Sequence, residues 1–143
     1  MNRLAKTAAA VCLCLLLLTG CTQYASFPNK STFSQVQEDG PVQMQVQTLD
    51  LENKTVKLVI QNSSAQQASF DKTTVLEREQ NGVWYAMQDE RSVESIGILL
   101  DASKKTDYTY SWEQPLPKGA YRLVKSFYLP QGKIDAAAYF TVE

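Results

Sequence analysis

The sequence predicts an all-β fold, an antiparallel β-sandwich of about seven or eight short strands. In several segments after residue 41, apolar and polar residues alternate, as in strands with one buried face. An Asn-Gly pair at residues 81–82 lies between two strand-like segments and indicates a hairpin. No segment after residue 20 shows a long helical period.

The first two strands are predicted at the start of this region. In the segment VQMQVQ, which begins at Val42, three apolar residues alternate with three glutamines. The segment TVKLVIQN, which begins at Thr55, repeats the pattern, with its apolar residues on one face. The polar stretch LDLENK between them fits a hairpin turn.

A third strand and a tight turn are predicted next. Residues 70–79 form the third strand, with Leu76 facing inward. Both central residues of a type I′ turn need positive φ, which Asn81 and Gly82 tolerate. The flanking segments LEREQ and VWYAM therefore form a hairpin.

The middle of the domain is less regular. The segment VESIGILL, residues 93–100, could form a helix or a strand, and its β-branched residues and Gly97 favour a strand. After it, Tyr108, Tyr110 and Trp112 alternate with polar residues and predict a strand with one aromatic face. Aromatic residues at this spacing more often face a core than a partner.

The last two strands are GAYRLVKSFYL and DAAAYFTVE, joined across residues 130–133. Tyr121 follows the loop EQPLPKG, where β-sandwiches place a tyrosine corner, in which the hydroxyl bonds to upstream backbone. This tyrosine favours a sandwich over a small barrel. Phe140 and Val142 should face inward. Lys125 shares the face of Tyr121, and a bulge or a snorkelling stem would accommodate it.

Several of these segments together resemble a known family. LEREQNGVWYAM, LPKGAYRLVKSF and AAAYFTVE, with the earlier VKLVIQNSS, resemble a bacterial immunoglobulin-like domain found in Firmicute lipoproteins. The resemblance covers residues 76–143 and the earlier strand. Members of that group often carry Pro-Gly before the sixth strand, where this chain has residues 101–103, Asp-Ala-Ser. The resemblance implies an immunoglobulin-like sandwich and no particular activity.

The amino-terminal segment predicts export. Arg3 and Lys6 precede an uncharged apolar stretch, residues 8–18. As a helix this stretch would rise about 16 Å, roughly half of a ~30 Å hydrocarbon core. A secretory signal peptide over residues 1–20 therefore fits better than a transmembrane helix.

The signal peptide ends at a cysteine. Leu18-Thr19-Gly20-Cys21 resembles the lipobox of bacterial lipoproteins. That resemblance implies cleavage before Cys21 and a diacylglyceryl group on its sulfur, with palmitate as a typical acyl chain. Two acyl chains hold a protein at a bilayer where one binds only reversibly. An ordinary secretory cut and an uncleaved anchor are the alternatives.

Residues 21–41 have a different composition from the rest of the chain. They are rich in Ser, Gln, Asn, Thr and Pro and show no sustained period. We expect a flexible or partly extended tether with an end-to-end distance of about 25 Å. Its aromatic residues, Tyr24, Phe27 and Phe33, could pack on the domain, but we expect them to lie near the membrane surface. The globular domain would then span residues 42–143.

Composition excludes several kinds of chemistry. The chain has no histidine, which removes the usual general base and zinc ligand. Two of its three cysteines, Cys12 and Cys14, lie in the signal peptide, and Cys21 would carry lipid. Without Arg3 and Lys6, 12 basic and 15 acidic residues leave a net charge of −3, which disfavours nucleic acid. The sequence predicts no enzyme, no cofactor and no metal site.

These observations favour a non-catalytic module. We expect a protein anchored to the outside of the cell membrane through the lipid on Cys21, with an immunoglobulin-like domain that contacts another envelope protein. The alternatives are an extracellular proteinase inhibitor, which would present EQPLPKG or SVESIG to a protease, and a sensor of a small ligand or the cell wall. A flat aromatic sheet face would favour partner binding, and a projecting loop would favour inhibition.

Overall fold

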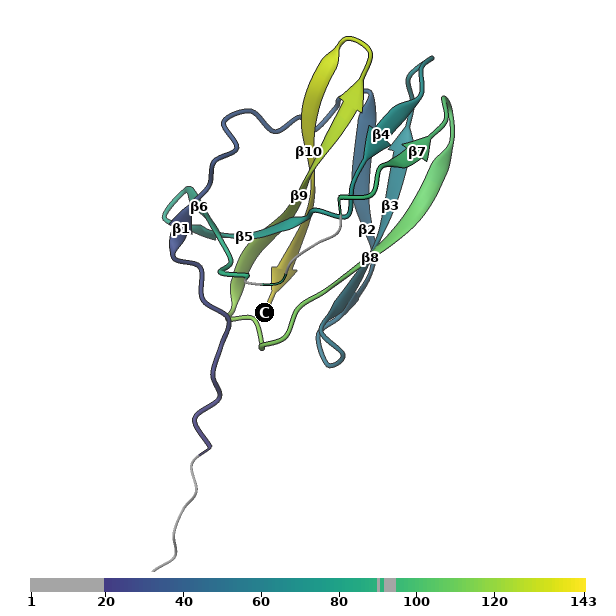
Figure 1. Cartoon of the computed structure of the whole chain (residues 1–143). Coiled ribbons are helices and arrows are strands. Elements are labelled where there is room, and N and C mark those ends of the chain that lie inside the picture. Colours follow the sequence, from purple (N-terminus) through teal and green to yellow (C-terminus); the bar gives the residue numbers. More distant parts are fainter. Residues whose placement is uncertain (1–19, 90, 92–94) are drawn as a thin grey trace, which may run out of the picture.

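The computed structural model describes residues 20–89, 91 and 95–143, and Figure 1 shows their arrangement. Within these residues the chain forms ten strands and no helix, so none is present that could cross a membrane. The strands are β1 (Asn29–Lys30), β2 (Val42–Asp50), β3 (Thr55–Asn62), β4 (Ala68–Phe70), β5 (Val75–Gln80), β6 (Val83–Ala86), β7 (Ile98–Leu100), β8 (Lys105–Ser111), β9 (Gly119–Leu129) and β10 (Gly132–Val142). The predicted signal peptide lies, apart from Gly20, outside the described residues.

The strands form two antiparallel sheets, which confirms the predicted sandwich. We call the larger one sheet A; its order is β1-β6-β5-β9-β4-β7, and β10 pairs with the other edge of β9. Sheet B has the order β2-β3-β8. The long strand β9 is central to sheet A because β5 pairs with its first half and β4 with its second. The two sheets approach each other where β2 passes β10 (Figure 1).

The core between the sheets contains the apolar residues that the alternation predicts. In sheet B, the inward face of β3 is fully buried, and β2 contributes Val42 and Met44. In sheet A, Leu76 of β5 and Phe140 and Val142 of β10 are buried as expected. The period-two pattern therefore assigned the inward faces of these strands correctly.

The predicted Asn-Gly hairpin joins β5 to β6. Asn81 has φ 52° and Gly82 has φ 78°, so both central residues have the positive φ of a type I′ turn. The third predicted strand is divided into β4 and β5. Residues 71–74 leave the sheet between them in a turn where the Asp71 carboxylate accepts a hydrogen bond from the Thr73 amide.

The expectation of a free tether is wrong for residues 25–37, which we call the strap. Ala25 and Phe27 are buried, and β1 within the strap pairs with β6. The Gln37 amide then donates a hydrogen bond to the Asp135 carbonyl at the edge of β10. Figure 1 shows the strap running from the foot of the domain past β1 and arching toward β10. Sequence composition could not reveal this, because the strap binds by backbone pairing and one aromatic anchor rather than by a periodic face.

Candidate functional site

Cys21 lies just outside the folded domain. It is exposed, as are the next three residues, and the chain joins the domain where the Ala25 amide donates a 2.9 Å hydrogen bond to the Pro115 carbonyl. Four residues span at most about 14 Å when fully extended. An attachment at Cys21 would therefore hold this end of the domain close to the attached surface.

Tyr121 fixes the loop next to this entry point. Its hydroxyl donates a hydrogen bond to the Pro117 carbonyl, which is the geometry of a tyrosine corner. Its ring stacks on Phe140 at 5.3 Å and meets the edge of Phe27 at 5.6 Å, measured between ring centres. Burial raises the pKa of Tyr121 to about 12, so the hydroxyl stays a donor at physiological pH.

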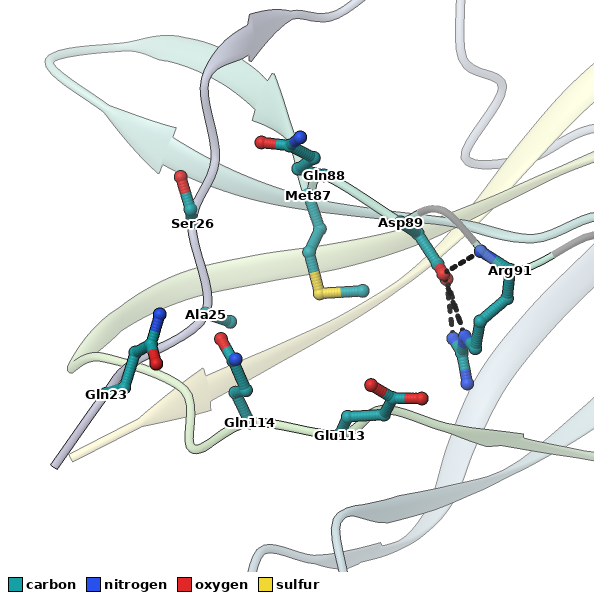
Figure 2. A pocket seen from close by; sticks show the side chains of 9 residues that line it. All are labelled: Gln23, Ala25, Ser26, Met87, Gln88, Asp89, Arg91, Glu113 and Gln114. Carbon is teal, nitrogen blue, oxygen red and sulfur yellow. Dashed lines mark hydrogen bonds and ion pairs between the residues drawn. The ribbon is translucent and has the colours of Figure 1, made fainter.

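A cleft of about 550 Å³ opens beside the same loop (Figure 2). Its walls come from the start of the strap, from the segment after β6 and from the segment after β8. Its lining residues are Gln23, Ala25, Ser26, Met87, Gln88, Asp89, Arg91, Glu113 and Gln114. Met87 points into the middle of the cleft in Figure 2, and the surrounding side chains are mostly amides and charged groups.

The charges of the cleft are arranged around one ion pair. The Arg91 Nη2 lies 2.6 Å from the Asp89 carboxylate, and Nε donates a second bond to it at 2.8 Å. These hydrogen bonds hold the pKa of Asp89 below its usual range, so Asp89 is unsuited to act as a general acid near neutral pH. Arg91 also lies over the Tyr110 ring, 5.7 Å from its centre. The amide and charged side chains that line the cleft could form hydrogen bonds with the polar groups of a ligand.

Aromatic side chains occur both in the core and on the surface of a sheet. Tyr110 and Trp112 are buried in the core, as their spacing predicts. Tyr128 and Tyr139 are 50% and 44% exposed on the outer face of sheet A, the face turned away from sheet B. Trp84 lies on the same face, where its ring meets the edge of Tyr139 at 6.1 Å between centres. Aromatic surface is therefore displayed on a sheet face.

Sequence reasoning missed a buried ion pair on that outer face. The Arg122 Nε donates a 2.6 Å hydrogen bond to Glu77, and the two side chains are 8% and 0% exposed. The Arg122 guanidinium also lies 4.5 Å from the centre of the Trp84 ring. Glu77 and Arg122 are 45 residues apart, and only the register of β5 on β9 brings them together. The one indication in the sequence was that Glu77 and Arg122 both alternate with inward-facing residues, so both fall on the outer faces of their strands.

Neither the cleft nor the ion pair forms a metal site. Across the described part of the chain, no three His, Cys, Asp or Glu side chains are grouped so that they could hold a metal ion. The Glu77 carboxylate is engaged by Arg122 and the Asp89 carboxylate by Arg91.

The family profile described as bacterial Ig-like domain matches residues 38–141, most of the chain. The chain belongs to this family. The match begins one residue after the strap ends, so the strap is an addition to the part of the chain that the bacterial Ig-like profile matches. The match supports the immunoglobulin-like fold that the sequence predicted.

Solved structures with a similar fold are distant from this bacterial Ig-like chain. The archaellum periplasmic stator protein FlaG from Sulfolobus acidocaldarius has 15% identity and a TM-score of 0.43, covering 69% of this chain and 99% of its own. The ApaA protein from Bordetella pertussis has 16% identity and a TM-score of 0.43, with 71% and 88% coverage. No curated protein matches the chain.

Proposed function

We propose that this protein is a cell-envelope lipoprotein, anchored by lipid on Cys21, whose bacterial Ig-like domain acts as a non-catalytic interaction or structural module. The observation that carries the proposal is the position of the lipobox. Cys21 ends a signal-like segment, is exposed, and precedes the first buried residue, Ala25, by only four positions. A folded domain directly after a lipobox is suited to presenting a surface at the membrane.

The short connection determines which surface would face the membrane. The loop 113–119 and the cleft lie beside the entry of the chain, so they would lie near the bilayer. The eleven residues of β9 extend about 35 Å away from that end. The exposed Tyr128 near the far end of β9 would therefore be available to extracytoplasmic partners. Confinement near a membrane raises the effective concentration of neighbours, so weak contacts suffice.

The alternative of a proteinase inhibitor is less well supported. One candidate loop, residues 113–119, would have to project into a protease, but Leu116 at its centre is 7% exposed. The loop is also tied down at both Pro117 and Lys118, whose carbonyls accept hydrogen bonds from Tyr121 and Arg78. A loop held in this way presents little extended backbone. The other, SVESIG at residues 92–97, lies partly outside the described residues, and its described part, residues 95–97, is exposed. The small-ligand sensor stays as an alternative because the cleft could bind a polar ligand.

The proposal is tested first at the anchor. Cells that express the wild-type chain should incorporate labelled fatty acid into it, and the Cys21→Ala variant should not. The control is thermal unfolding of the purified soluble part, which the substitution should leave unchanged because Cys21 is exposed. Incorporation of label by the Cys21→Ala variant would contradict the lipid anchor.

The interaction role is tested in intact cells. Crosslinking should recover an envelope protein with the wild-type chain, and recovery should fall when Cys21 is removed and the domain is released, because it is then no longer confined at the membrane. The purified chain should not turn over peptide, ester, glycoside or phosphate substrates. Saturable turnover that persists through repurification would contradict the module, and tight stoichiometric inhibition of an extracellular protease would favour the inhibitor.

A further inference from the structure

A second buried patch lies on the outer face of sheet A, separate from the core. Val124 of β9 and Ala137 of β10 are partners in register and are 1% and 7% exposed. They alternate with the inward residues and are not part of the cluster between the sheets. The outer face of a two-layer sandwich normally meets water, so their burial requires a cover.

The strap supplies that cover. Its Ser31 amide donates a 2.9 Å hydrogen bond to the Trp84 carbonyl of β6, and its Gln37 amide donates a 2.8 Å bond to the Asp135 carbonyl of β10. These two attachments lie on opposite sides of sheet A, so residues 32–36 must cross the outer face between them (Figure 1). Ser31 lies beside Arg122, and Gln37 lies beside Asp135. In the register of β9 on β10, Val124 and Ala137 lie between these two positions, so the crossing runs over them.

The strap is an extended segment held by few contacts. Among the described residues, 32–36 make no backbone-to-backbone hydrogen bond, and the Phe33 amide donates only within the strap, to Ser31 Oγ at 3.2 Å. β1 pairs with β6 through only two residues. Phe27 is the large buried anchor of the strap. Segments with few buried side chains and few hydrogen bonds open locally at lower free energy than the core.

The strap also leaves a polar group beneath it incompletely satisfied. Ser31 Oγ accepts a long, 3.4 Å hydrogen bond from Arg122, while Glu77 Oε1 is buried without a hydrogen-bond partner. A longer amide side chain at the position of Ser31 could accept from Arg122 through its carbonyl and donate to Glu77 through its NH₂ group. The outer face therefore has a hydrogen-bond acceptor, Glu77 Oε1, that the strap leaves unpaired.

We propose that the outer face of sheet A under the strap is a docking groove for an extended segment of a partner protein, which replaces the strap. The segment pairs with the edge of β6 as β1 does, covers Val124 and Ala137, and places an amide side chain over the Glu77–Arg122 pair. This inference rests on the proposed interaction function and names the surface that serves it.

Opening of the strap is measured with reporter cysteines in the full mature chain. Cys21→Ser leaves the reporter as its single thiol. Ala137→Cys places a thiol under the strap, and Ala138→Cys places the matched control on the inward face of the same strand. We expect Ala137→Cys to react with a thiol reagent at least roughly tenfold faster than Ala138→Cys, because local opening of the strap exposes the thiol at position 137. Equal rates would overturn the proposal, because the strap would then open only with the whole domain.

Loosening the strap should affect the two reporters differently. Ser31→Pro removes the donor to Trp84, and it should speed labelling of Ala137→Cys while leaving Ala138→Cys unchanged. Phe33→Ala provides a second variant, in the half-buried middle of the strap. A parallel increase at both reporters with both variants would mean that the strap belongs to the global fold, and would overturn the proposal.

Docking is measured with synthetic peptides of residues 25–37. Added to the Ser31→Pro variant, the peptide should slow labelling of Ala137→Cys, and a scrambled peptide should not. A peptide carrying Ser31→Gln should protect at lower concentration, because its amide can reach Glu77. Absence of protection by both peptides would overturn the groove. If crosslinking still recovered a partner at the membrane, the interaction function would stand and another surface would carry it.

Discussion

The ammonium of Lys125 lies 4.1 Å from the centre of the Tyr108 ring, in the space between the two sheets. Its Nζ donates hydrogen bonds of 2.9 Å to the carbonyls of Asp71 and Thr73 and to the Thr74 hydroxyl. The register of β9 on β10 is continuous, so no bulge accommodates the lysine there. The aliphatic part of its side chain crosses the core, and its ammonium group is hydrogen-bonded to the turn that separates β4 from β5.

This buried lysine predicts an unusual alkaline stability profile. Burial lowers the pKa of Lys125 from 10.5 to about 8, so between these values the unfolded chain binds more protons than the folded one. Stability should therefore rise as the pH increases from about 8 to about 10. Above pH 10 the rise should end, because burial raises the pKa of Tyr110 and Tyr121 to about 12 in the folded state.

Urea denaturation between pH 7 and pH 11 measures this profile. The matched control is Lys125→Met, which removes the titrating group and should abolish the rise. A wild-type stability that falls steadily from pH 8 would contradict a neutral lysine in the core.

Tyr121 should contribute separately through its hydroxyl and its ring. Tyr121→Phe should lower the free energy of unfolding by about 1 kcal/mol, because the bond to the Pro117 carbonyl is lost. Tyr121→Ala should cost several times more, since it leaves a cavity against Phe140. Equilibrium unfolding of both variants checks this; a neutral Tyr121→Phe would show that the residue only packs.

Substitutions of the buried pair Glu77–Arg122 should have non-additive effects on the free energy of unfolding. Arg122→Met alone should lower stability by about 3–5 kcal/mol, because the Glu77 charge stays buried without compensation. The double variant Glu77→Leu/Arg122→Met should be more stable than this single variant. A double-mutant cycle by urea denaturation measures the difference, and simple additivity would mean that the two charges are independent.

The turn between β5 and β6 should depend on glycine. Gly82→Ala should destabilise by about 1 kcal/mol, because φ is 78° and no neighbouring atom lies within 4 Å of the added Cβ, so backbone strain alone acts. Gly97→Ala is the matched control, since that position is equally open and has no positive φ. Thermal unfolding compares them, and equal melting temperatures would contradict a strained turn.

The start of the strap, around Phe27, should be part of the folded unit. Phe27→Ala should lower the free energy of unfolding by about 3–5 kcal/mol, because Phe27 is buried against Tyr121. Phe33→Ala, in the half-buried middle of the strap, should cost much less. Urea denaturation of the mature chain tests both, and equal small losses would restore the free tether.

The sequence by itself determined most of the strands, their inward faces and the Asn-Gly turn, but not β1 or the break between β4 and β5. Alternation in VQMQVQ and TVKLVIQN specifies faces because successive side chains in a strand point to opposite sides. Asn81 and Gly82 specify a turn because few other residues tolerate positive φ. The lipobox at Cys21 is equally local, and its lipid stays a prediction.

Only the tertiary structure decided the rest, because those features depend on contacts between distant parts of the chain. The strap has no periodic face, and it became ordered through the edges of β6 and β10 and a pocket for Phe27. Glu77 lies beside Arg122 because of the register of β5 on β9. Lys125 donates hydrogen bonds to three oxygens in a turn more than fifty residues earlier in the chain. Local sequence patterns specify which way a side chain points, and long-range packing decides which group it meets.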